Sequence, residues 1–274
     1  MNPAVPVSVV VPCFRCASTI ERAVQSVAAQ SSRPAEVVLV DDCSQDQTLD
    51  ILKSLAARHA PGWIKIKRLD NNRGAASARN AGWAVASQPF VAFLDSDDAW
   101  HPKKLEIQYD FMQRNPEVAL CGHGHRLLKQ NTLPDWDVSI STFTAISRWR
   151  LLISNQFVTP SVMLRRNIYP RFVDDQRHME DHMLWLQISF SGAGVMKLDA
   201  ELAAIYKAPF GVGGLSAQIA LMERGELKNY RRLLRSKFIN RYQFVAICSY
   251  SLLKYFRRLA IYGSHFLWKR NIHG

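Results

Sequence analysis

The first 121 residues alternate between short β-branched runs and segments with helical spacing of apolar or small residues. A strand followed by a helix, repeated four times over about 115 residues, is typical of βαβ units and of a parallel sheet covered by helices on both faces. We therefore expect an α/β fold. The predicted strands cover residues 7–11, 36–40, 63–69, 90–94 and 118–121, and the predicted helices cover 18–30, 48–59, 75–86 and 103–114.

Polar residues follow several of these predicted strands at the points where the strands end. Pro12 follows the first strand, Asp41 and Asp42 follow the second, and Asp95 follows the fourth. In parallel sheets, ligands bind beyond the carboxyl ends of the strands. We therefore expect the functional site at this edge.

The second half of the chain is less regular. Short strands are predicted at 162–165, 195–198 and 203–206, and Ser18 and Glu21 have the spacing of a capping box for the first helix. Further helices are predicted at 180–190, 217–238 and 242–268. We expect one domain over residues 1–216 and a basic helical tail over 217–274.

Positive charge is concentrated near the carboxyl terminus. The whole chain carries a net charge of +12, and residues 223–274 alone carry 12 Lys or Arg against 2 Asp or Glu. Only about 11 apolar residues stand together at 243–253, whereas a membrane-spanning helix needs about 20. The tail is expected to lie on an anionic membrane surface or to pack on the main domain. A nucleic-acid-binding tail is the alternative from another class.

The cysteines indicate a reducing compartment. There are five of them, without the regular spacing of a disulfide framework. Cys13 and Cys16 form a C-x-x-C directly after the first strand, but the rest of a thioredoxin pattern is missing. The apolar run at 7–12 has no basic segment before it, so no signal peptide is predicted.

Asp95, Asp97 and Asp98 place three carboxylates within four residues. Like charges this close repel one another unless a cation neutralises them, and oxygen ligands suit Mg²⁺ or Mn²⁺. A solvated acidic turn that caps the following helix is the alternative. Residues 72–80 open a helix with small residues and with Arg79, which can bind phosphate oxygens. No G-x-G-x-x-G follows the first strand, which disfavours a nicotinamide-dependent dehydrogenase.

Glu180 and Asp181 stand at the beginning of a predicted helix. Carboxylates are favoured there by the helix dipole, so their presence needs no functional reason. The functional interpretation is a general base that deprotonates an acceptor hydroxyl.

Taken in order, these segments resemble the family 2 glycosyltransferases of the GT-A fold, over about residues 7 to 216. The matching segments are residues 9–12, 40–44, 72–80, 93–98 and 180–181. The resemblance implies a mostly parallel central sheet flanked by helices. It also implies that Pro12, Phe14 and Asp42 hold the nucleoside, although the family commonly has Tyr-Asn where this chain has Phe14 and Arg15.

The same resemblance assigns the remaining site residues. Arg79 would lie near the nucleotide, Asp95 and Asp97 would contact the metal ion and the donor, and Asp181 would be the catalytic base. Lys207 and residues 214–216 would belong to a loop that closes over the donor.

The implied activity is an inverting, metal-dependent transfer of a hexose. The donor would be a nucleotide diphosphate sugar, most often carried by UDP, and the acceptor would be a glycan or a lipid-linked glycan of the cell surface. Mn²⁺ or Mg²⁺ would be the cofactor, and no nucleic acid is expected as a partner. The place of action would be the cytoplasmic face of the plasma membrane. A non-catalytic nucleotide-sugar-binding protein is a further alternative.

Overall fold

The computed structural model of this chain describes residues 4–130, 132–136, 142–206 and 219–272, with side chains as far as residue 260. It divides into two compact units, Met1–Pro209 and Phe210–Gly274. The domain boundary expected after residue 216 lies outside the described residues and stays a prediction.

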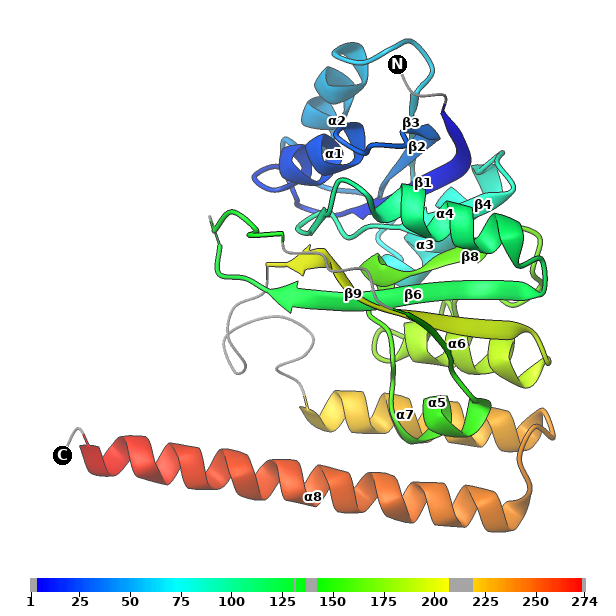
Figure 1. Cartoon of the computed structure of the whole chain (residues 1–274). Coiled ribbons are helices and arrows are strands. Elements are labelled where there is room, and N and C mark those ends of the chain that lie inside the picture. Colours follow the sequence, from blue (N-terminus) through cyan, green and yellow to red (C-terminus); the bar gives the residue numbers. More distant parts are fainter. Residues whose placement is uncertain (1–3, 131, 137–141, 207–218, 273–274) are drawn as a thin grey trace. The chain divides into compact units, whose positions relative to one another are not determined.

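The first unit is built on one mixed sheet (Figure 1). Its strand order is β3-β2-β1-β4-β8-β6-β9-β5, and β7 pairs with β9. The first four strands along the chain are parallel to one another, while β8 is antiparallel to both of its neighbours, β4 and β6. The strands are β1 (Val5–Cys13), β2 (Pro34–Asp41), β3 (Ile64–Arg68), β4 (Phe90–Phe93), β5 (Ala99–Trp100), β6 (Val118–Leu127), β7 (Phe143–Ala145), β8 (Met163–Arg165) and β9 (Gly194–Ile205).

Helices cover both faces of this sheet, as the sequence predicts. Val9 of β1 belongs to a buried cluster with Val24 of α1, Leu52 of α2 and Met112 of α4. On the opposite face, Trp83 of α3 contacts Phe93, and an aromatic chain continues through Phe172 to Trp185 of α6. The helices are α1 (Ile20–Ala28), α2 (Thr48–Ala57), α3 (Ala75–Val85), α4 (Lys104–Arg114), α5 (Arg148–Ile153) and α6 (Glu180–Phe190), with a 3-10 turn at Thr159–Ser161.

Helix α3 approaches the sheet unusually closely at Gly82. A Cβ atom placed on Gly82 would lie 2.4 Å from Cγ1 of Val10 and 3.0 Å from Cγ2 of Val40. Both valines belong to the central strands β1 and β2. The missing side chain therefore sets the distance between α3 and the sheet.

Several local details differ from the sequence-based expectations. The two short strands expected at 195–198 and 203–206 form one strand, β9, because it pairs with β6 along nearly its whole length. The expected capping box is wrong: Thr19 precedes α1 and makes no side-chain cap. The backbone N–H groups of Thr19 and Ile20 bond to the carbonyl of Cys16 instead. Elements β5, β7 and α5 were not expected.

The second unit contains α7 (Ile219–Arg235) and α8 (Arg241–Ile272), which pack against each other. Polar side chains hold the pair together. Oγ of Ser251 donates to Glu223 at 2.7 Å, and Nζ of Lys254 donates to Glu226 at 2.9 Å. The hydroxyl of Tyr230 also donates to Glu226. Within the described residues, none of the helices combines the length and apolarity needed to cross a bilayer.

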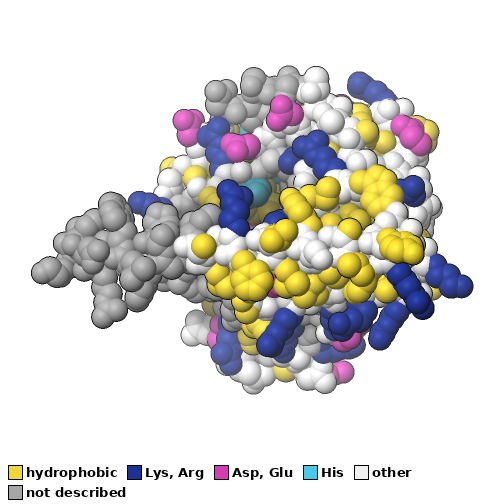
Figure 2. Space-filling model, turned by 90° about the horizontal axis from the view of Figure 1, so that it is seen from below, with side chains coloured by type: hydrophobic (Ala, Val, Ile, Leu, Met, Phe, Trp, Pro, Cys, Tyr) yellow, Lys and Arg dark blue, Asp and Glu magenta, His cyan; other side chains and the backbone are white. Residues whose placement is uncertain are grey.

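The apolar side chains of α8 face outward. Tyr242, Val245, Leu253 and Phe256 are each more than 60% exposed, and Leu252 and Leu259 are about 40% exposed. Their spacing places them along one stripe of the helix. Figure 2 shows a band of apolar side chains with Lys and Arg side chains beside it. Leu233 of α7 and Ile247 of α8 are buried, so this pair of helices has an exposed apolar stripe in addition to its buried apolar residues.

Candidate functional site

The carboxyl ends of three strands lie side by side at one edge of the sheet. The N–H of Asp42, just after β2, donates to the carbonyl of Cys13 in β1 at 2.8 Å. The N–H of Leu94, just after β4, donates to the carbonyl of Val10 at 3.1 Å. Pro12, Asp42 and Asp95 therefore lie at the same edge, as expected from parallel strands.

The segment after β1 presents an aromatic ring to solvent. Phe14 is 43% exposed, and the guanidinium of Arg15 lies 5.2 Å from the centre of its ring. Arg15 has a left-handed backbone with φ of 49°, and its N–H donates to Oγ of Ser44 at 3.1 Å. Pro12 is half-buried just before this turn. An exposed ring held by a fixed turn is suited to stacking against a planar base.

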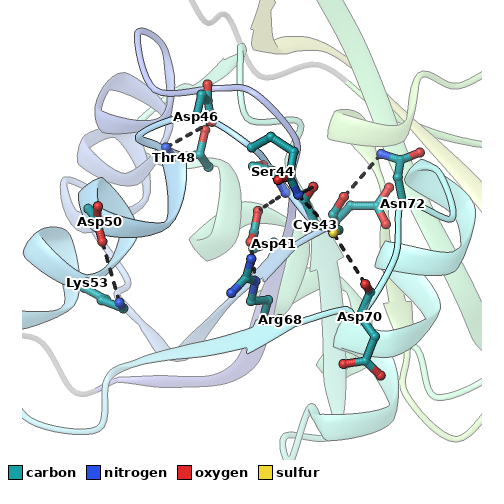
Figure 3. A network of polar contacts seen from close by, with 12 residues as sticks. Asp41, Cys43, Ser44, Asp46, Thr48, Asp50, Lys53, Arg68, Asp70 and Asn72 are labelled. Carbon is teal, nitrogen blue, oxygen red and sulfur yellow. Dashed lines mark hydrogen bonds and ion pairs between the residues drawn. The ribbon is translucent and has the colours of Figure 1, made fainter.

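The two aspartates at the end of β2, Asp41 and Asp42, are buried and bound to the backbone. Figure 3 shows Asp41 with its partners Ser44 and Arg68. Oδ1 of Asp41 accepts from the N–H of Ser44 at 3.1 Å, and Oδ2 lies 3.5 Å from Nε of Arg68. The two carboxylate oxygens of Asp42 accept from the N–H groups of Arg73 and Gly74, each at 2.8 Å. Asp42 thus anchors the turn that starts α3, and its contact with a nucleoside stays a prediction.

An open cavity of about 290 Å³ lies beside this network. Its lining is rich in positive charge, which favours an anionic or hydrogen-bonding ligand. The sequence patterns gave no sign of it, because its residues come from the end of β3 and an irregular loop. The lining residues are Lys67, Arg68, Leu69, Asp70, Asn71 and Arg73.

Arg79 connects two acidic segments that are far apart in the sequence. Its Nη2 donates to Oδ1 of Asp95 at 2.7 Å, and its Nη1 donates to Oε1 of Glu180 at 3.1 Å. The Arg79 side chain is 6% exposed. Burial disfavours its charged form, but Asp95 and Glu180 outweigh this effect and raise the pKa of Arg79. A buried guanidinium between two carboxylates makes charge-assisted hydrogen bonds, which are the strong kind.

The three carboxylates of the acidic turn after β4 have different surroundings. Oδ1 of Asp95 binds Arg79. Asp98 is completely buried, and its Oδ1 accepts from the N–H of Tyr206 at 3.1 Å. Asp97 is half-buried, and its carbonyl oxygen accepts from Nη2 of Arg22. Asp98 therefore has a structural contact, and ligand binding by the Asp97 carboxylate stays a prediction.

The residues at this turn fit a divalent ion that is shared with a substrate. Among the described side chains, no three His, Cys, Asp or Glu residues converge to form a metal site on their own. Mg²⁺ is usually held by one or two carboxylates together with substrate phosphates and water. The Asp97 carboxylate, with Asp95 nearby, matches that donor set.

Asp181 begins α6 next to Glu180. Its Oδ1 accepts from the N–H of His182 at 2.6 Å, and its Oδ2 accepts from Nδ2 of Asn155 at 3.3 Å. Burial and the neighbouring charge of Asp181 raise the pKa of Glu180 to about 7, against the lowering effect of Arg79. Asn155 follows α5 in a segment where no sequence motif marks it.

The structure therefore brings Arg79, Asp95 and the Glu180–Asp181 pair together. Lys207 and residues 214–216, expected to close over the donor, lie outside the described residues. All five cysteines are free thiols, and both Cys13 and Cys16 are buried. A hydrogen bond between the two thiols lowers the pKa of Cys16, and burial raises the pKa of Cys13.

Several glycosyltransferases resemble this chain in sequence. A teichuronic acid biosynthesis glycosyltransferase of Bacillus subtilis, TuaG, is 41% identical over 128 residues, which is 47% of this chain and half of its own length. The Escherichia coli protein WfgD is named as a UDP-Glc:alpha-D-GlcNAc-diphosphoundecaprenol beta-1,3-glucosyltransferase. It is 32% identical over 66% of this chain and 69% of its own length. WfaP, of the same species and named activity, is 35% identical over 68% of this chain and 71% of its own length.

Solved structures share the fold at lower sequence identity. S. aureus TarS 1-349 in complex with UDP-GlcNAc has a TM-score of 0.68 and 21% identity, covering 92% of this chain and 72% of that one. The mannosyltransferase PcManGT from Pyrobaculum calidifontis, in complex with GDP-Man and Mn²⁺, has a TM-score of 0.66 and 18% identity. It covers 84% of this chain and 64% of the other. The expected GT-A fold is confirmed.

A family model gives the most direct assignment. The model described as "Glycosyl transferase family 2" matches residues 8–171, more than half of the chain. This range contains the strand-end segments and the acidic turn described above. The chain belongs to glycosyl transferase family 2.

Proposed function

We propose that this protein is an inverting glycosyltransferase that moves a hexose from a UDP-linked donor to a hydroxyl group of a lipid-linked glycan. The observation that supports it most is the guanidinium of Arg79, which joins Asp95 of the acidic turn to Glu180 beside Asp181. The proposed donor-binding segment and the neighbour of the candidate base, 85 residues apart by number (95 and 180), are thereby bound to one buried cation.

In the proposed reaction, Asp181 accepts the proton of the acceptor hydroxyl. The hydroxyl oxygen bonds to the anomeric carbon from the face opposite the diphosphate, and the bond from that carbon to the phosphate oxygen breaks. The configuration at the anomeric carbon is therefore inverted. The contacts from Asn155 and from the His182 N–H orient the Asp181 carboxylate for this role.

A divalent ion, Mn²⁺ or Mg²⁺, would be held by Asp97 with Asp95 nearby. When bound, it would neutralise the charge that develops on the leaving diphosphate. Mn²⁺ is present in the similar structure of PcManGT. Arg79, fixed between its two carboxylates, keeps the Asp95 side chain in one orientation.

The donor and acceptor classes are supported by the names of the relatives. WfgD and WfaP are named for a UDP-Glc donor and a diphosphoundecaprenol-linked acceptor. TarS was solved with UDP-GlcNAc. We infer that this chain uses a related donor and adds a sugar during the synthesis of a cell-surface polysaccharide. Pro12, Phe14 and Asp42 would hold the nucleoside, and Lys207 would act from the later loop.

We also propose that the protein works at the cytoplasmic face of a membrane. The support is the apolar stripe of α8, with exposed side chains such as Leu253 and Phe256. Arg231, Arg235 and Arg241 are exposed in the same unit. An apolar stripe bordered by cations is the composition of helices that lie in the headgroup region of anionic bilayers.

The activity is tested with a panel of nucleotide sugars, by measuring hydrolysis in Mn²⁺, in Mg²⁺ and in EDTA. Slow hydrolysis of a UDP-hexose that needs the metal ion is expected, and no acceptor has to be known. Asp97→Asn should remove the metal-dependent part. Equal hydrolysis by wild type in Mn²⁺ and EDTA would contradict the proposal.

The membrane location is tested separately by sedimentation with vesicles that contain anionic lipid. Leu253→Glu places a charge in the α8 stripe and should reduce the bound fraction severalfold. Leu133→Glu, at a residue 89% exposed in the first unit, is the matched control. Equal binding of the two variants would show that α8 does not contact the bilayer.

A further inference from the structure

Three polar side chains in and just after α1 bind the backbone that follows the acidic turn. They stand four residues apart, at Arg22, Ser26 and Gln30, and therefore point from the same side of the helix. Arg22 donates to the carbonyl of Asp97, and Oγ of Ser26 accepts from the N–H of Trp100 at 3.1 Å.

Gln30 makes two further backbone contacts in the same segment. Its Nε2 donates to the carbonyl of His101 at 2.8 Å, and its Oε1 accepts from the N–H of Leu105 at 2.9 Å. Residues 97–105 are thus held at four backbone atoms by one row of side chains. Because these contacts are made to backbone atoms, they fix the position of residues 97–105 independently of the side chains in that segment.

Arg22 differs from the other two because it also contacts the end of β9. Its guanidinium lies 3.7 Å from the centre of the Tyr206 ring. The N–H of Tyr206 donates to Asp98 in the acidic turn. Arg22, Asp97, Asp98 and Tyr206 therefore form a closed set of contacts around that turn. We call this set the turn clamp.

The Arg22 side chain is energetically unfavourable in one respect, which indicates that it has a specific role. Its Nε is buried and has no hydrogen-bond partner among the described residues. An unsatisfied buried donor is unfavourable, and an apolar side chain of similar length would avoid it. What only the guanidinium supplies is the combination of a planar face for Tyr206 and a donor for Asp97.

We propose that Arg22 is a positioning residue, which holds the Asp97 peptide so that the Asp97 carboxylate faces the divalent ion and the donor diphosphate. This inference rests on the proposed function, since it assumes that Asp97 binds the metal ion. Arg22 acts through the backbone of Asp97 and needs no contact with the substrate.

The test is calorimetric titration of UDP into the protein, once with saturating Mn²⁺ and once with EDTA. Arg22→Gln should weaken UDP binding about tenfold in Mn²⁺, as expected for the loss of one positioning hydrogen bond. In EDTA, the variant and the wild type should bind UDP equally. Arg22→Lys keeps a donor but loses the planar face. In Mn²⁺, its affinity for UDP should lie between those of Arg22→Gln and the wild type.

Gln30→Ala is the matched control. It removes two hydrogen bonds to the same segment, at His101 and Leu105, and should lower the Tm while leaving the Mn²⁺-dependent gain in UDP affinity unchanged. Tyr206→Phe keeps the ring under Arg22 and should also bind as wild type. If Arg22→Gln does not fold, Arg22→Lys carries the comparison.

These measurements distinguish the positioning role of Arg22 from the binding of the metal ion by Asp97. Loss of the Mn²⁺ effect in Asp97→Asn, with an unchanged effect in Arg22→Gln or Arg22→Lys, would overturn the positioning role alone. An equal loss in Gln30→Ala and Arg22→Gln would also overturn it. A wild type that binds UDP no better in Mn²⁺ than in EDTA would refute the metal assignment itself.

Discussion

Nη2 of Arg79 lies 2.7 Å from Oδ1 of Asp95, so a residue within α3 is bonded directly to the turn that follows β4. The same guanidinium reaches Glu180 at the beginning of α6. Arg79 thus supplies a buried positive charge to a carboxylate on each side. Removing it would take a buried cation from two largely buried acidic groups.

Arg79→Met should therefore lower the free energy of unfolding by about 3 to 5 kcal/mol, the range for breaking a buried ion pair. Chemical denaturation of the two proteins measures the difference. The control is Arg73→Met, since Arg73 is 57% exposed and lies 3.9 Å from Asp174. That change should alter the free energy of unfolding by about 1 kcal/mol or less. Equal effects of the two substitutions would contradict the central place of Arg79.

Asp181→Asn should abolish proton acceptance while keeping the side-chain shape and its contact with Asn155. Transfer to the acceptor should fall on the order of 10² to 10⁴-fold, and the Kd for UDP should be unchanged. Radiolabelled sugar transfer and calorimetry give the two values. Asp50→Asn, a neutralisation on the exposed surface of α2, should change neither. Normal transfer by Asp181→Asn would place the base elsewhere.

Asp97 and Asp98 are adjacent, but their substitutions should have different consequences. Asp97→Asn should remove Mn²⁺-dependent turnover with little change in Tm, because Asp97 is half-buried and the carbonyl that Arg22 binds is kept. Asp98→Ala removes the acceptor for the Tyr206 N–H and should lower the free energy of unfolding by about 1 to 3 kcal/mol. Enzyme kinetics and thermal melts of both variants measure these effects. A large loss of stability in Asp97→Asn, or loss of Mn²⁺-dependent turnover with normal stability in Asp98→Ala, would contradict the roles given to the two residues.

The pH dependence of stability should reflect Glu180. Burial and the charge of Asp181 raise its pKa from the ordinary 4.5 to about 7 in the folded protein, against the opposite effect of Arg79. The folded state therefore binds the proton more tightly than the unfolded state. The protonated Glu180 carboxyl therefore contributes its full stabilisation below about pH 4.5, and this contribution is lost as the pH rises to about 7.

Glu180→Gln should remove this component, which amounts to on the order of 2 kcal/mol over that interval. Urea denaturation at several pH values would show it as a flatter curve than that of wild type. Glu21→Gln changes a half-exposed surface ion pair with Arg58, and its curve of unfolding free energy against pH should run parallel to that of wild type. Parallel curves for Glu180→Gln and wild type would mean that Glu180 is ionised throughout.

Much of the first unit can be predicted from the sequence because its strands β1, β2 and β4 are buried on both faces. Runs such as residues 7–11 contain no polar interruption other than Ser8, and their ends bring Pro12, Asp42 and Asp95 to one edge. The elements β5, β7 and α5 have two, three and six residues. Segments this short show no periodicity, so their pairing is decided by contacts with β9 and α6.

The site was harder to predict wherever a contact involves the backbone or a distant side chain. Asp95, Asp97 and Asp98 look equivalent in the sequence, and only the positions of Arg79 and Tyr206 distinguish them. Arg22 was missed because its partner is a carbonyl group, which no residue type reveals. The spacing of Arg22, Ser26 and Gln30 was visible in the sequence, but polar residues four apart on a helix are usually solvated.

Gly82 links packing to chemistry. One added methyl group would lie 2.4 Å from Cγ1 of Val10, too close for any Cβ atom, so we expect α3 to move outward from the sheet. Arg79 stands three residues, nearly one helical turn, before Gly82, and it would be carried along. The absence of a Cβ atom at Gly82 therefore helps to determine whether the guanidinium of Arg79 can contact Asp95 and Glu180.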